Sequence, residues 1–221
     1  MIEAATRHRN TSVPARELLS LLEAVVLAKV PENRVRKDIE TGLFPRRRVV
    51  RIDNRRLCFR WTDVFALAAV YGNRNLNGKM RKLVLDKVEG MGCWSSLHFD
   101  HWCSTHLGDL KPIYIDSCLF IDANRVCENV RPRVALYAHG LDRVEERDGV
   151  LGGETVFKNT RISVRHIGNL YKKGESLRNI LEDYPAITED DIYFSDLYSQ
   201  AHSITGRPRT RGEVGDVLGA G

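Results

Sequence analysis

The sequence predicts a mainly α-helical protein with small β elements, an α+β fold. Most segments space their apolar residues three and four apart, as amphipathic helices do. Short alternating apolar runs stand at a few places, where a strand or hairpin fits. Ser, Thr or Asn precedes several helical runs and Gly follows them, as expected for helix caps.

Composition is that of a globular chain. The 221 residues are 43% hydrophobic and 29% charged, which excludes a disordered or fibrous protein and allows one or two domains. No apolar run has membrane-spanning length, and the N-terminus lacks the apolar middle of a signal peptide. Five cysteines without a C-x-x-C pair favour a reducing, cytoplasmic location.

The positive charge is concentrated in residues 30–61. This stretch holds ten Lys and Arg residues against four Asp and Glu residues, a net +6, whereas the whole chain is only +5. Charge gathered in one segment indicates an anionic partner, and a pI near 9.0 is compatible with nucleic acid.

The N-terminal elements are expected in this order. Ser12 caps a helix that enters through Pro14 and runs to about Lys29. A second helix covers residues 33–40, and Thr62 caps a third that ends at Gly72. Residues 12–72 are therefore expected to form a self-contained unit.

The second of these helices is followed by a basic hairpin. Val35 and Ile39, four apart, face a core, while Asn33, Arg36, Lys37 and Glu40 fall on the other side. Gly42 ends the helix with a positive φ. Two short runs, 48–52 and 55–59, are joined by Asp53-Asn54 as a tight turn. The pattern predicts a winged helix-turn-helix; the alternative is a solvated basic face on a small α+β domain.

The same stretch resembles the helix-turn-helix of the MerR-like regulators. The resemblance rests on RVRKDIETGLFP at 34–45, the hairpin, and WTDV at 61–64, about the first third of the chain. We therefore expect residues 1–75 to be a winged helix-turn-helix DNA-binding domain. The predicted DNA-binding residues are Asn33, Arg34, Arg36, Lys37, Arg46, Arg47, Arg48, Arg51, Arg55 and Arg56.

Residues 76–143 form a middle region that could connect the two ends or provide a dimer surface. Helical spacing runs through 79–89. A group of soft and imidazole side chains then invites a zinc site: Cys93, His98, His101, Cys103 and His106. Their spacing matches no usual structural-zinc template, so a packed linker is preferred and no metal or other cofactor is expected.

The rest of the middle region reads as strands and a helix. Residues 112–126 alternate, which predicts two strands around Asp116-Ser117, or a strand and a turn. A helix is expected from about Cys127 to Val144, with Pro132 in its first turn.

Residues 144–202 are expected to hold two strands and three helices. The first strand is 144–147, and the second is 155–157, between tight turns at Gly152-Gly153 and Asn159. The three helices carry N-terminal caps and end at Gly174, before Pro185 and near His202. These caps are Ser163, Ser176 and Thr188, the last with Asp191 in a capping box. The prediction is a three-helix, helix-turn-helix-like bundle.

This segment resembles a small bacterial domain family that is assigned to VapB-type antitoxins. The motifs are GG at 152–153, VF at 156–157, TRI at 160–162, GES at 174–176, ILEDYP at 180–185 and TEDDI at 188–192. Thr155 stands where the family has Pro, and Asn159 where it has Gly. Asn tolerates the left-handed region, so the turn is expected to form.

The resemblance implies an antitoxin of a type II VapBC-like toxin-antitoxin system. Such a protein neutralises a PIN-domain ribonuclease toxin and binds operator DNA as a transcription repressor of its own operon. A homodimer is expected, because symmetric operators match two-fold proteins. Residues 145–199 carry a net −4, so DNA is assigned to residues 31–60, and this bundle to dimerisation or partner contact.

The last segment, 203–221, is expected to be a flexible toxin-binding tail. Its arginines Arg207, Arg209 and Arg211 could replace the metal among the carboxylates of a PIN nuclease; the alternative is a disordered basic tail. No enzyme is expected, because the acid pairs lie at helix ends and Gly152-Gly153 lacks a P-loop lysine. The alternative function is a stand-alone MerR-like transcriptional regulator whose C-terminal bundle dimerises or senses a ligand.

Overall fold

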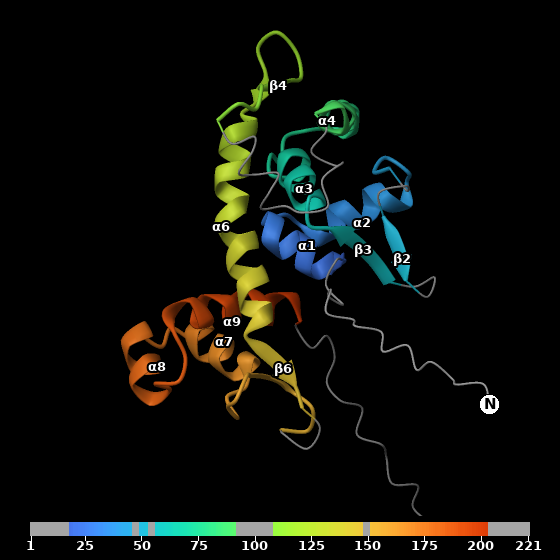
Figure 1. Cartoon of the computed structure of the whole chain (residues 1–221). Coiled ribbons are helices and arrows are strands. Elements are labelled where there is room, and N and C mark those ends of the chain that lie inside the picture. The colour runs from blue at the N-terminus through green and yellow to red at the C-terminus, as the bar shows by residue number, and fades with distance from the viewer. Residues whose placement is uncertain (1–17, 46–48, 53–55, 92–107, 148–150, 203–221) are drawn as a thin grey trace, which may run out of the picture.

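A computed structural model describes residues 18–45, 49–52, 56–91, 108–147 and 151–202. The protein is mainly α-helical with a few short antiparallel strand pairs, as the sequence predicts. The long helix α6 (Ala123–Asp142) runs past the N-terminal elements with one half and meets the C-terminal helices with its other end (Figure 1).

The N-terminal part combines a small sheet with four helices. The strands are β1 (Leu18–Ser20), β2 (Val50–Ile52) and β3 (Arg56–Arg60), in the antiparallel order β1-β3-β2. The helices are α1 (Leu21–Ala28), α2 (Glu32–Glu40), α3 (Asp63–Tyr71) and α4 (Gly78–Gly90). The connection between α1 and α2 is only residues 29–31.

The start of the first helix was predicted wrongly. Residues 18–20 are a strand that pairs with β3, so α1 begins at Leu21. Ser20 is the N-cap: its hydroxyl accepts from the Glu23 amide, and the Glu23 carboxylate accepts from the Ser20 amide at 2.7 Å. This capping box, S-x-x-E, fixes the helix start by local hydrogen bonds.

The middle region holds a hairpin and the long helix. Strands β4 (Ile113–Tyr114) and β5 (Phe120–Ile121) pair around Asp116, which confirms the prediction of two strands. Helix α6 begins four residues earlier than predicted, because Asp122 caps it by accepting from the Arg125 amide. Pro132 consequently lies inside the helix and not in its first turn.

The C-terminal part follows the prediction closely. Strands β6 (Val144–Glu146) and β7 (Thr155–Phe157) pair, and helices α7 (Val164–Lys172), α8 (Leu177–Asp183) and α9 (Glu189–Ala201) follow. Ser163, Ser176 and Thr188 cap the three helices with their side chains, and Asp191 completes a capping box. In the turns of this part of the chain, Gly152, Gly153, Asn159 and Gly174 have positive φ angles.

One hydrophobic core runs through both ends of the described chain, from Leu19 in β1 to Tyr198 in α9. Helices α7 and α9 pack closely at Gly168, where a Cβ atom would stand 2.3 Å from the Ser195 carbonyl oxygen. The N-terminal unit therefore shares its core with α6 and α9, and the predicted boundaries at residues 75, 143 and 202 stay a prediction.

Among the described helices, none is long and apolar enough to cross a membrane.

Candidate nucleic-acid interface

Helix α2 presents a polar face to solvent. Asn33, Arg36, Lys37 and Glu40 are exposed, and their spacing of three and four residues places them on one side. The opposite side, with Val35, Asp38 and Ile39, is buried. This division confirms the sequence prediction, and Asp38, which the prediction did not place, is buried as well.

Arg34 does not belong to the exposed face. Its side chain is half-buried, and its guanidinium donates to the Leu76 carbonyl oxygen at 2.6 Å. Leu76 lies in the connection between α3 and α4, so Arg34 ties α2 to that connection. Its predicted role as a DNA-contacting residue stays a prediction.

Asp38 and Arg81 anchor the buried side of α2. The Asp38 carboxylate, 4% exposed, accepts two hydrogen bonds from the Arg81 guanidinium, at 2.6 and 2.8 Å. The hydrogen bonds to Asp38 raise the pKa of Arg81. Arg81 also donates to the Leu76 carbonyl oxygen at 2.8 Å. A bidentate pair of this kind fixes the orientation of one helix on another.

The hairpin stands beside α2. Phe44, just past the helix, packs edge-on against Phe59 of β3, with ring centroids 5.9 Å apart. Pairing of Ile52 with Arg56 closes the β2-β3 ladder, and Arg51 lies opposite Leu57. Arg51 and Arg56 are thus strand residues, whereas four other predicted contacts lie outside the described residues: Arg46, Arg47, Arg48 and Arg55.

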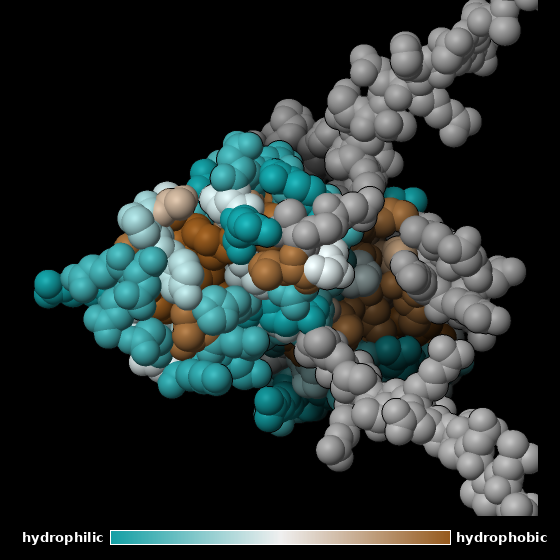
Figure 2. All heavy atoms as spheres, turned by 90° about the horizontal axis from the view of Figure 1, so that it is seen from below, coloured by the Kyte–Doolittle hydropathy of each residue, from teal (hydrophilic) through white to brown (hydrophobic). Residues whose placement is uncertain are grey.

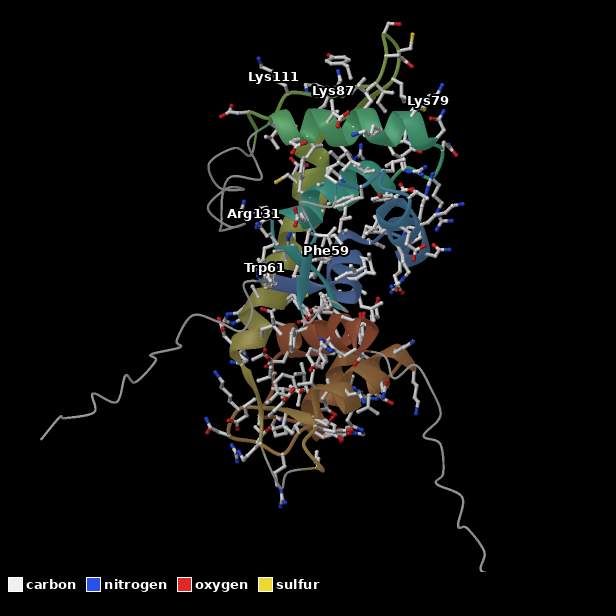
Figure 3. The ribbon with its side chains drawn as sticks, turned by 90° about the vertical axis from the view of Figure 1, so that its right-hand side faces the viewer. Phe59, Trp61, Lys79, Lys87, Lys111 and Arg131 are labelled. Carbon is white, nitrogen blue, oxygen red and sulfur yellow. The ribbon has the colours of Figure 1, made fainter. Side chains whose placement is uncertain are left out.

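Helix α4 brings two lysines to the end of α2, which the sequence analysis did not predict. Lys79 and Lys82 line a shallow hollow of about 560 Å³ together with Thr41 and Gly42 at the end of α2. Lys79 lies at one end of α4 and Lys87 farther along it (Figure 3). The helical spacing of 79–89 predicts the helix, but only the fold shows which element its first turn faces.

The C-terminal part offers a different surface. Glu189 and Asp190 are exposed at the start of α9, while Asp191 is buried and takes two 2.6 Å bonds from the Arg143 guanidinium. Burial opposes ionisation, but the bonds from Arg143 and Thr188 prevail and lower the pKa of Asp191. On the side that carries α8, hydrophilic residues predominate, with some apolar residues between them (Figure 2).

Two predicted sites fall outside the described residues. The tail arginines Arg207, Arg209 and Arg211 are one, and the second is the Cys and His cluster: Cys93, His98, His101, Cys103 and His106. In the part of the chain that the structure does describe, no group of three or more His, Cys, Asp or Glu residues could hold a metal ion.

Comparisons with known proteins match both the C-terminal segment and most of the chain. A family model described as "Protein of unknown function (DUF433)" matches residues 144–198. The chain is also similar to "Uncharacterized protein y4eO" of Sinorhizobium fredii (strain NBRC 101917 / NGR234). The two are 25% identical over 206 residues, which cover 90% of this chain and 87% of that protein. No solved structure matches significantly.

Proposed function

We propose that the protein is a DNA-binding antitoxin of the VapB type, which represses its own operon and neutralises a PIN-domain ribonuclease. The observation that carries the DNA-binding part is the placement of α2. It exposes Asn33, Arg36 and Lys37 on one face, beside a hairpin that carries Arg51 and Arg56. A helix of this kind reads base edges in the major groove, and the hairpin contacts phosphates.

The sheet order supports the same assignment. Strand β1 precedes the two helices and pairs with β3, so α1, α2 and the hairpin form one unit. Arg34 and Arg81 support α2 from its buried side by converging on the Leu76 carbonyl oxygen. A reading helix must keep its orientation to select bases, and these bonds provide that support.

We assign toxin binding to the C-terminal part of the chain. The segment that resembles VapB-type antitoxins, 144–202, folds into β6, β7 and the bundle of α7, α8 and α9. Acidic side chains at the start of α9 disfavour phosphate contact there. We propose that Arg207, Arg209 and Arg211 bind the active site of the nuclease. We also expect a cytoplasmic homodimer.

Co-expression with the product of the neighbouring gene tests this function. The full chain should co-purify with a small nuclease and abolish its ribonuclease activity. Changing Arg207, Arg209 and Arg211 together to Ala should restore ribonuclease activity at least tenfold. A chain that neither binds nor inhibits the neighbouring product, yet still binds its promoter, would overturn the antitoxin assignment and leave a stand-alone regulator.

A further inference from the structure

A groove of about 700 Å³ lies where α1, α3 and α6 meet the β4-β5 hairpin. Its described lining combines apolar or small residues with three cations and two asparagines, Asn73 and Asn129. The apolar or small part, called the floor below, includes Ala28, Ala68, Ala69, Ile121 and Val130. The volume lies in the range of sites that take small organic ligands.

The charged residues of the described groove lining are all cations. Lys29, Arg125 and Arg133 line the groove, and none of its described lining residues is Asp or Glu. Within the described chain, no carboxylate pairs with any of these three side chains. Three cations around an apolar floor, without a counter-charge, favour an anion that carries an apolar body.

Arg133 is the most firmly placed of the three. Its Nε donates to the Leu27 carbonyl oxygen at 2.8 Å, so the guanidinium is held against the last turn of α1. Burial lowers the pKa of Arg133. A bound carboxylate would offset this unfavourable desolvation and accept a charge-assisted hydrogen bond.

We propose that this groove binds a small amphipathic carboxylate, with the apolar body against the alanines and the carboxylate at Lys29, Arg125 and Arg133. Lys29 is the first residue of the turn from α1 to α2. Ligand binding would therefore act on the DNA-reading helix, a step that rests on the proposed function.

Calorimetric titration of the full chain with decanoate, below its micelle concentration, tests the site without DNA or toxin. We expect saturable one-to-one binding, and at least tenfold weaker binding of decyltrimethylammonium, which has the same tail and the opposite charge. The double variant Lys29→Gln, Arg125→Gln should weaken decanoate binding at least tenfold. Arg131→Gln, a change on the same helix outside the groove lining, should leave it unchanged.

A second variant is needed in case the double variant Lys29→Gln, Arg125→Gln does not fold. Asn129→Asp keeps the shape of an exposed groove residue and adds a negative charge, so decanoate binding should fall at least fivefold. Equal binding by all variants, or none by the wild type, overturns the proposal. Binding of an acidic amphipathic peptide in place of decanoate also overturns it and assigns the groove to a protein partner. None of these outcomes bears on DNA or toxin binding.

Discussion

The phenol of Tyr137 donates a hydrogen bond to the Glu23 carboxylate over 2.8 Å, and this bond joins the long helix α6 to the first turn of α1. His202, at the end of α9, lies 3.2 Å from the same phenol oxygen and 3.4 Å from the carboxylate. Elements more than a hundred residues apart thus meet at one polar cluster between the N-terminal unit and the C-terminal bundle.

Tyr137→Phe should destabilise the protein by about 2 kcal/mol. The ring stays in place, because Tyr137 is fully buried. The charged Glu23 carboxylate, however, loses the hydrogen bond that it accepts from the Tyr137 hydroxyl. Urea unfolding followed by circular dichroism measures the change. Tyr114→Phe, at a half-exposed tyrosine of the β4-β5 hairpin, should change stability by less than about 0.5 kcal/mol. Equal losses in the two variants would show that the Tyr137 bond contributes nothing.

Glu23 should make stability depend on acid pH. Burial opposes ionisation, but hydrogen bonds from His202, Ser20 and Tyr137 lower the pKa of Glu23 from 4.5 to about 2. The folded-state pKa lies below the unfolded one, so this stabilisation is present above about pH 4.5 and is lost as the pH falls toward 2. The difference corresponds to about 3 kcal/mol.

Urea unfolding of the wild type and Glu23→Gln from pH 6 to pH 2 measures this contribution. The wild type should lose its advantage over the variant across that interval, and the two curves should converge near pH 2. Curves that stay parallel would show that Glu23 ionises alike in the folded and unfolded chain.

Gly168→Ala should be among the most destabilising small substitutions, at about 3 kcal/mol or more. A Cβ atom there would stand 2.2 Å from the Ser199 hydroxyl and 2.3 Å from the Ser195 carbonyl, so α7 and α9 would have to separate. Gly90→Ala is the matched control, because nothing lies within 4 Å of its Cβ position. Thermal unfolding should show a large fall in Tm only for Gly168→Ala; similar Tm values would contradict the close packing.

Arg81→Gln should weaken DNA binding without removing a DNA contact. It leaves the buried Asp38 carboxylate without its bidentate partner, which we expect to cost about 3 kcal/mol and to loosen α2. Lys82→Gln, one residue on, removes an exposed pair with Asp86 and is the control for stability, which should be unchanged. Unfolding curves of both variants and a DNA titration of Arg81→Gln measure the two effects. An Arg81→Gln protein as stable as the wild type would remove the support proposed for α2.

Local signals in the sequence predicted much of the fold. The capping box of Thr188 and Asp191 and the positive φ at Gly42 and Asn159 act within a few residues, so their motifs can be recognised without tertiary structure. The Ser20 and Glu23 box is equally local, but the apolar spacing from residue 18 onward also fits a helix. Pairing with β3 decided in favour of a strand at 18–20.

Long-range relations could not be predicted in the same way. Asp38 is buried on α2, and the guanidinium that pairs with it belongs to Arg81, 43 residues later. The bond from Arg34 to the Leu76 carbonyl oxygen likewise joins α2 to a connection 42 residues later. Pro132 was placed in a first turn, although Asp122 starts the helix earlier and the helix continues through the proline. The first two outcomes depend on which elements pack together, whereas the third comes from a local cap at Asp122 that the sequence analysis missed.

Fluorescence anisotropy with the promoter fragment upstream of the gene tests most directly whether the exposed face of α2 reads DNA. The double variant Arg36→Gln, Lys37→Gln should bind at least a hundredfold more weakly than the wild type at physiological salt. The matched variant Lys172→Gln, Lys173→Gln removes two exposed lysines from the C-terminal bundle and should bind as the wild type does. Loss of binding in the second variant with full binding in the first would contradict the account.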